Sequence, residues 1–147
     1  LIIVGRGHMK KKLLKVARKM KIQNSIHIIS SMSFEDLAQH FRSADLVIYP
    51  SYYEGQGLIP LEAMSSGTPV ATVDQPPLTE MVDSSVGVLF KRGHSGDLAN
   101  KVNEILADSK RRSSIIELGR ERVLEKYTYE HNAKDYIEIY RSISSKV

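Results

Sequence analysis

Short apolar runs alternate with amphipathic segments along the whole chain. Runs of β-branched and other apolar residues predict buried strands at residues 1–5, 25–30, 45–50, 69–73 and 86–90. Helical spacing of apolar residues predicts helices at 9–21, 33–43, 58–66 and 78–82, and then near 95–108, 110–126 and 129–144. This alternation is typical of a doubly wound α/β fold, in which right-handed crossovers produce a parallel sheet with helices on both faces.

Two of the predicted helices have recognisable ends. Ser33 is followed three residues later by Asp36, a capping pattern that opens a helix at this point. The helix at 58–66 tolerates Pro60 in its first turn, where the missing N–H has no intrahelical partner, and Gly67 supplies a left-handed stop. These local signals agree with the boundaries that the apolar periodicity predicts.

The segment after the third strand, YPSYYEGQGLIPLEAM at residues 49–64, runs through a Gly-x-Gly step into a helix. Ligands of doubly wound sheets bind beyond the carboxyl ends of the strands, where helix N-termini offer unpaired N–H groups. Gly55 and Gly57 allow the backbone to approach a bound group closely, because no side chain intervenes. A phosphate or a sugar is therefore expected beside this loop.

Glu54 and Glu62 flank that step and narrow the choice of ligand. Carboxylates repel phosphate but accept strong hydrogen bonds from neighbouring hydroxyls, as on a sugar or a ribose. The pattern favours a ligand with hydroxyls at both ends and phosphate between them, which is the layout of a nucleotide sugar. The alternative is that Glu54 is a solvated loop residue and Glu62 only favours the helix dipole.

Composition limits the remaining choices. A length of 147 residues with 41% hydrophobic residues fits a single compact domain. The absence of Cys excludes disulfides and thiolate chemistry and suits a reducing, cytoplasmic environment. Five His without a pair at ligand spacing argue against a metal site. No apolar run approaches the roughly 20 residues needed to span a bilayer.

The net charge of +4 comes from clustered cations. The larger cluster consists of Lys10, Lys11, Lys12, Lys15, Arg18, Lys19 and Lys21, and a smaller one of Lys110, Arg111 and Arg112. Such runs are usually the solvated face of a helix, which we prefer to binding of nucleic acid or of an anionic membrane. Peripheral contact with the inner face of a membrane is left open.

The stretch from Tyr49 to Val73 closely resembles the donor-binding segment of retaining GT-B glycosyltransferases (group 1, family 4-like), which include glycogen synthases, sucrose-phosphate synthases and lipid mannosyltransferases. Glu54 and Glu62 match the signature of two Glu separated by seven residues. Around them Gly55, Gly57, Pro60, Ala63, Gly67, Thr68 and Pro69 are in register. VGRGH at 4–8 looks like the family's VGxGP loop, and EKYTYE at 125–130 is similar to its closing segment. The resemblance covers nearly the whole chain and implies a Rossmann-like donor-binding domain.

The resemblance also implies roles for single residues. Glu54 would contact the hydroxyls of the transferred sugar, as the catalytic residue of this chain, and Glu62 would contact the ribose. The N–H groups around Gly57 and Leu58, with Gly55 and Gln56 beside them, would contact the diphosphate or the sugar. In this family transfer retains the anomeric configuration and needs no metal or other cofactor, with a UDP-, GDP- or ADP-sugar as donor.

Four further residues are candidates through the same resemblance. Arg6, Gly7 and His8 belong to the VGRGH loop, and Glu80 stands where the family has a Glu in a later loop. Arg6 has a planar fork of donors that suits phosphate, although a solvated loop cation explains it at least as well. His8 is better explained as an incidental loop residue than as a nucleotide contact.

Two departures from the family pattern bear on the pocket. Pro76-Pro77 stands where many members have Gly-Gly, and proline has no N–H to offer a ligand. Gln56 stands where many members have an aromatic residue, which makes that wall of the predicted sugar pocket more polar. Both departures are expected to affect the choice of sugar.

The family pattern also predicts parts that this chain lacks. Leu1 already lies inside an apolar run, and the family's earlier strand, its Gly-Arg loop and a following Lys are missing. We therefore expect an N-terminally truncated donor-binding domain of a two-domain enzyme. A separate N-terminal domain would hold a glycan, lipid or other acceptor, and this chain alone would be inactive.

Two other functions are compatible with the sequence. A Rossmann-like module could hold a nucleotide or a nucleotide sugar without transfer, and a nucleotide-sugar epimerase shares the two-domain architecture. An epimerase would need additional acid and base residues in the crevice, whereas the paired glutamates favour transfer.

Overall fold

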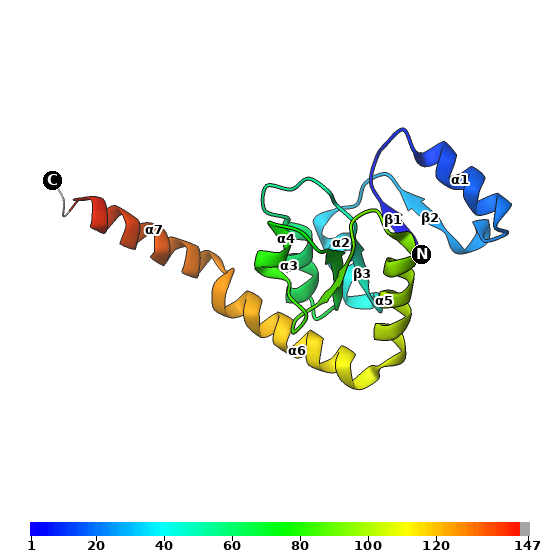
Figure 1. Ribbon diagram of the computed structural model, residues 1–147. Coiled ribbons are helices and arrows are strands. Elements are labelled where there is room, and N and C mark those ends of the chain that lie inside the picture. Colours follow the sequence, from blue (N-terminus) through cyan, green and yellow to red (C-terminus); the bar gives the residue numbers. More distant parts are fainter. Residues whose placement is uncertain (145–147) are drawn as a thin grey trace. The chain divides into compact units, whose positions relative to one another are not determined.

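The computed structural model describes residues 1–144, and it divides the chain into two compact units, Leu1–Gln39 and His40 onward. In the first unit, β1 (Ile2–Val4) pairs in parallel with β2 (His27–Ile29), with Ile3 opposite Ile28. The crossover between them consists of α1 (Lys10–Lys19), which buries Ala17, and the short 3₁₀ turn η1 (Gln23–Ser25) (Figure 1).

The helix α2 (Phe34–Ser43) runs from the first unit into the second. Its start is capped as the sequence predicts, because the Ser33 hydroxyl accepts the Asp36 N–H at 3.0 Å. Its end is anchored in the second unit, where Phe41 is buried and its carbonyl accepts a hydrogen bond from the buried Thr68 hydroxyl.

The second unit is built on a parallel sheet of three strands (Figure 1). The strands are β3 (Val47–Tyr49), β4 (Val70–Val73) and β5 (Val88–Phe90), in the order β3-β4-β5. All four residues of the central strand β4 are buried, since helices cover such strands on both faces. The register places Tyr49 opposite Thr72 at the carboxyl ends of β3 and β4.

Helices pack on this sheet and on one another. α3 (Leu58–Ser65) contacts the strands β3 and β4 and the helix α6 (Ser109–Lys126). α4 (Leu78–Met81) contacts β4, and α5 (Ser95–Ala107) contacts β5. At Gly119 of α6 a Cβ would lie 3.3 Å from the Val86 carbonyl oxygen and 3.5 Å from Met64 Cγ on α3. The last helix, α7 (Tyr129–Ser144), contacts α6 and buries no residue.

Periodicity predicted the elements but not the pairing of all strands. Within residues 1–144, each of the five predicted strands and seven predicted helices forms within a few residues of its predicted bounds, and only η1 was not expected. The strands form two parallel sheets rather than the single sheet that the alternation indicated. Pairing depends on which backbone edges meet in three dimensions, and an apolar run of three to five residues does not encode its neighbour.

Candidate functional site

The loop of residues 50–57 leaves the carboxyl end of β3 and leads directly into α3, which begins at Leu58 as predicted. Gly55, Gln56 and Leu58 are exposed, whereas Glu54 and Glu62 are half-buried. The structure therefore places the predicted loop residues at the sheet edge where ligands of α/β folds bind. We call this segment the 50–57 loop.

Tyr49, at the end of β3, holds Glu54 in place. Its phenol donates a hydrogen bond to Glu54 Oε1. Burial, followed by the hydrogen bond and the negative charge of Glu54, raises the pKa of Tyr49 to about 12. The Ser51 and Tyr49 hydroxyls keep the pKa of Glu54 below its usual value. At neutral pH Glu54 is therefore an oriented carboxylate whose free lone pairs can accept hydrogen bonds.

Glu62 lies on α3, one turn beyond its start, and its charge also reaches Tyr49. That charge is the smallest of the causes that raise the Tyr49 pKa. Within residues 1–144 the half-buried Glu62 carboxylate has no hydrogen-bond partner. Both predicted carboxylates therefore act on the Tyr49 phenol, Glu54 through a hydrogen bond and Glu62 through its charge alone.

Gly57 is required by the backbone that joins the loop to α3. Its φ of 85° is left-handed, and a Cβ there would lie 2.7 Å from Leu78 Cδ2 on α4. Gly55 differs, because a Cβ at that position would meet no atom within 4 Å. The close approach at Gly57 packs the start of α3 against α4, the helix that carries Glu80.

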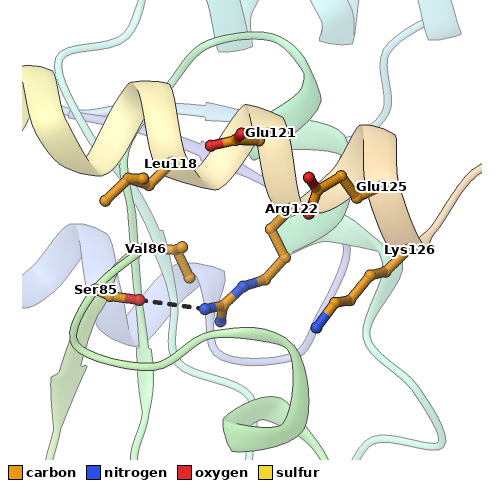
Figure 2. A pocket seen from close by; sticks show the side chains of 7 residues that line it. All are labelled: Ser85, Val86, Leu118, Glu121, Arg122, Glu125 and Lys126. Atoms are coloured by element: carbon orange, nitrogen blue, oxygen red, sulfur yellow. Dashed lines mark hydrogen bonds between the residues drawn. The ribbon is translucent and has the colours of Figure 1, made fainter.

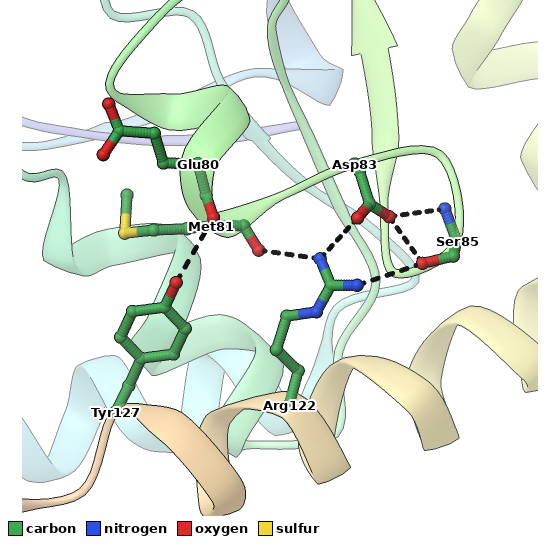
Figure 3. A network of polar contacts seen from close by, with 6 residues as sticks. All are labelled: Glu80, Met81, Asp83, Ser85, Arg122 and Tyr127. Atoms are coloured by element: carbon green, nitrogen blue, oxygen red, sulfur yellow. Dashed lines mark hydrogen bonds and ion pairs between the residues drawn. The ribbon is translucent and has the colours of Figure 1, made fainter. Parts of the chain in front are cut away.

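Glu80 is exposed on α4, and its side chain points away from the polar network that fixes this helix (Figure 3). The Tyr127 hydroxyl donates to the Glu80 carbonyl at 3.3 Å. Arg122 Nη1 lies 2.8 Å from Asp83 Oδ2 and 3.3 Å from the Met81 carbonyl. Arg122 on α6 and Tyr127, directly after that helix, therefore anchor the end of α4.

The pocket in Figure 2 lies elsewhere in the second unit. Its volume is about 180 Å³, and its walls come from α6 and from the segment before β5: Ser85, Val86, Leu118, Glu121, Arg122, Glu125 and Lys126. Ser85 and Val86 precede β5, so this hollow is at the amino end of that strand, whereas the 50–57 loop follows the carboxyl end of β3. None of the predicted site residues lines it.

Arg6, Gly7 and His8 lie in the first unit, in the exposed loop that follows β1. The Arg6 guanidinium donates to the Ser31 hydroxyl at 3.4 Å. This loop leaves the carboxyl end of its own strand, as expected for a ligand-binding loop. The roles of these three residues and of Glu80 stay predictions.

Residues 1–144 bear on two further questions, metal binding and membrane crossing. They contain no group of three or more His, Cys, Asp or Glu side chains placed to hold a metal ion. No helix in this part of the chain has the length and apolar character that crossing a bilayer requires. Peripheral contact with a membrane, which the sequence leaves open, is not tested by these residues.

Comparison with known proteins identifies the class to which this fold and loop belong. Residues 1–122 match the family model described as glycosyl transferases group 1. The chain therefore belongs to the group 1 family of GT-B glycosyltransferases. An uncharacterised glycosyltransferase of Methanocaldococcus jannaschii is 29% identical over 142 residues, which are 96% of this chain and 36% of that protein. The chain thus spans little more than a third of this relative's length.

Solved structures agree with the family assignment. Sucrose-phosphate synthase from Thermosynechococcus elongatus superposes with a TM-score of 0.87 at 26% identity, covering 100% of this chain and 39% of that one. The Anabaena protein HepE, crystallised in complex with UDP, has a TM-score of 0.88 at 23% identity, covering 96% of this chain and 40% of its own. The α/β architecture predicted from the alternation is confirmed as that of GT-B proteins.

Proposed function

We propose that this chain is the donor-binding part of a glycosyltransferase that moves a sugar from a nucleotide-sugar donor to an acceptor. The observation that carries the proposal is the Tyr49 hydrogen bond that orients Glu54 at the sheet edge, just before α3, the helix that carries Glu62. Membership of the group 1 family supports it. The donor is a UDP-, GDP- or ADP-sugar.

In the proposed mechanism each carboxylate accepts hydrogen bonds from a different part of the donor. Glu54, ionised and oriented by Tyr49 and Ser51, accepts hydrogen bonds from the hydroxyls of the transferred sugar. Glu62 accepts from the ribose. Backbone N–H groups at Gly57 and Leu58, where α3 begins, face the diphosphate.

Transfer in this proposal proceeds with retention of configuration and without a metal ion. The bond between the anomeric carbon and the donor phosphate oxygen breaks, and the acceptor hydroxyl oxygen bonds to that carbon from the same face. The leaving phosphate oxygen takes the proton of the hydroxyl. No protein nucleophile is required, so Glu54 acts by orienting the sugar and by electrostatic stabilisation of the positive charge that develops on the ring. A further domain holds the acceptor, and residues 1–147 alone transfer nothing.

Titration of the full-length protein against UDP-, GDP- and ADP-sugars tests the proposal. One nucleotide should bind in competition with its nucleotide sugar, and incubation with candidate acceptors should release the nucleoside diphosphate. Binding without any transfer or hydrolysis would favour a non-catalytic module, and a changed sugar on an intact nucleotide would favour an epimerase. No binding of any of these donors would refute the proposal.

A further inference from the structure

Three loops at the carboxyl edge of the three-stranded sheet are joined by one side chain, that of Arg92. Arg92 comes two residues after β5, Gln75 two residues after β4, and Tyr52 and Tyr53 belong to the 50–57 loop that follows β3. The guanidinium carbon of Arg92 lies 4.8 Å from the Tyr52 ring centroid and 5.3 Å from that of Tyr53. These distances are within the range of cation–π contacts.

Hydrogen bonds also link Arg92, Gln75 and the two tyrosines. Arg92 donates to the Tyr53 hydroxyl at 3.4 Å and to Gln75 Oε1 at 3.5 Å. Gln75 in turn donates from Nε2 to the Tyr52 carbonyl at 2.8 Å. A planar guanidinium suits this arrangement because it stacks on rings with its faces and donates from its edge.

The 50–57 loop has little else to fix the part that precedes Glu54. Tyr53 is 84% exposed and Tyr52 is 40% exposed, so burial of apolar surface contributes little there. Glu54 is tied to Tyr49 on one side, and the two tyrosines are tied to Arg92 on the other. The position of the Glu54 carboxylate therefore depends on two independent attachments.

We propose that Arg92 is a positioning residue that holds the 50–57 loop, through Tyr52 and Tyr53, in the conformation that presents Glu54 to the sugar of the donor. This rests on the proposed function for the identity of the ligand. Arg92 itself does not contact the donor. Its loss lowers the fraction of molecules whose loop is competent to bind, and donor affinity falls in proportion to that fraction.

Hydrogen exchange tests the attachment without any ligand. In the full-length protein, peptides covering residues 50–57 should take up deuterium faster in Arg92→Gln than in the parent. Arg111→Gln, at an exposed arginine of α6, is the matched control and should leave this loop unchanged. Thermal unfolding of both variants should match the parent because both side chains are exposed. Unchanged exchange of the loop in Arg92→Gln would overturn the proposal.

Donor titration separates positioning from direct contact. For the nucleotide sugar that the parent binds, Arg92→Gln should raise Kd roughly 5- to 20-fold. Arg92→Lys keeps the charge but lacks the planar fork, so its Kd should stay close to that of Arg92→Gln. Full rescue of Kd by Lys, with exchange of residues 50–57 still as fast as in Arg92→Gln, would indicate a point charge facing the donor phosphates and would overturn the proposal.

A double-mutant comparison shows whether Arg92 acts through the two rings. In a background of Tyr52→Leu with Tyr53→Leu, adding Arg92→Gln should change loop exchange and donor Kd little further, because the contacts are already lost. If Arg92→Gln changes loop exchange and donor Kd as much in this background as in the parent, Arg92 does not act through the tyrosines. If the parent binds none of the nucleotide sugars, the proposed function fails, while the exchange experiment still decides whether Arg92 holds the loop.

Discussion

At the scale of single residues, Tyr49 accounts for the difference between the two glutamates. It donates directly to Glu54, whereas Glu62 influences it only through charge. One Glu54 oxygen accepts a hydrogen bond from Tyr49. The Glu62 carboxylate has no hydrogen-bond partner within residues 1–144, so both of its oxygens can bind a ligand. The pair therefore has one carboxylate with a fixed orientation and one that can adjust to its ligand.

This difference predicts separable kinetic effects in the full-length protein. Glu62→Gln should raise the Michaelis constant for the donor and leave turnover nearly unchanged, since the ribose is held alike in ground state and transition state. Glu54→Gln should mainly depress turnover, because positive charge on the sugar ring develops only in the transition state. Each effect should be about 10- to 150-fold, as expected for one hydrogen bond to a charged group.

Steady-state kinetics with varied donor concentration measure both constants. Thermal unfolding of each variant must match the parent, because a loss of stability imitates either result. Two variants that bind donor and turn over like the parent would show that neither carboxylate takes part.

At the scale of elements, the junction between the 50–57 loop and α3 depends on Gly57. Gly57→Ala combines left-handed strain with the close approach to Leu78 Cδ2 on α4. We expect it to lower the free energy of unfolding by roughly 1–3 kcal/mol. Gly67→Ala carries the strain alone, since φ is 77° and a Cβ would meet no atom within 4 Å, so its cost should be smaller.

Chemical denaturation of the three Gly→Ala variants at positions 55, 57 and 67 provides the comparison. Gly55→Ala has neither left-handed φ nor a close neighbour and should be nearly neutral in stability. Equal stability of Gly57→Ala and Gly55→Ala would contradict the packing of α3 against α4 described above.

The attachment of α6 to the end of α4 predicts a pH-dependent contribution to stability. The Ser85 hydroxyl and the Arg122 guanidinium lower the pKa of Asp83 to about 2, from 3.8 (Figure 3). A carboxylate with a depressed folded-state pKa stabilises the protein above its unfolded-state pKa, and this contribution is lost as pH falls through the folded-state value. Because the Asp83 side chain is 51% exposed, solvent screening reduces the effect to about 1 kcal/mol.

Asp83→Asn should therefore unfold more easily than the parent by about 1 kcal/mol at pH 7. As pH is lowered from 4 to 2, the difference between the two proteins should shrink. Urea denaturation at several pH values measures it, with Glu117→Gln, at an exposed position of α6, as the control. A difference that stays constant down to pH 2 would mean that the charge of Asp83 does not matter.

At the scale of the whole molecule, backbone N–H groups at the start of α3, rather than a metal, stabilise the leaving diphosphate in the proposed mechanism. Chelation with EDTA should therefore leave transfer by the full-length protein unchanged, as measured by release of the nucleoside diphosphate. Activity that is lost in EDTA and restored by Mg²⁺ or Mn²⁺ would contradict the metal-independent mechanism.

The sequence by itself determined the elements and the local chemistry of the 50–57 loop. The apolar periods of its strands and helices, the cap at Ser33 and the glycine before Leu58 are local signals, and all appear in the structure where they were expected. Glu54 and Glu62 were recognisable because their spacing around a Gly-x-Gly step is also local. Short-range sterics and hydrogen bonding act on the same residues that carry such signals.

Only the tertiary structure decided which distant residues meet. The sequence predicts Tyr49 only as part of a strand, although its side chain orients Glu54. Arg92, Gln75 and Arg122 gave no signal, because their partners lie 17 to 41 residues away in the chain. The pairing of β1 with β2 and of β3 with β4 was decided at the same level. Contacts of this kind depend on the meeting of loops and backbone edges after folding, and residue spacing along the chain does not specify that meeting.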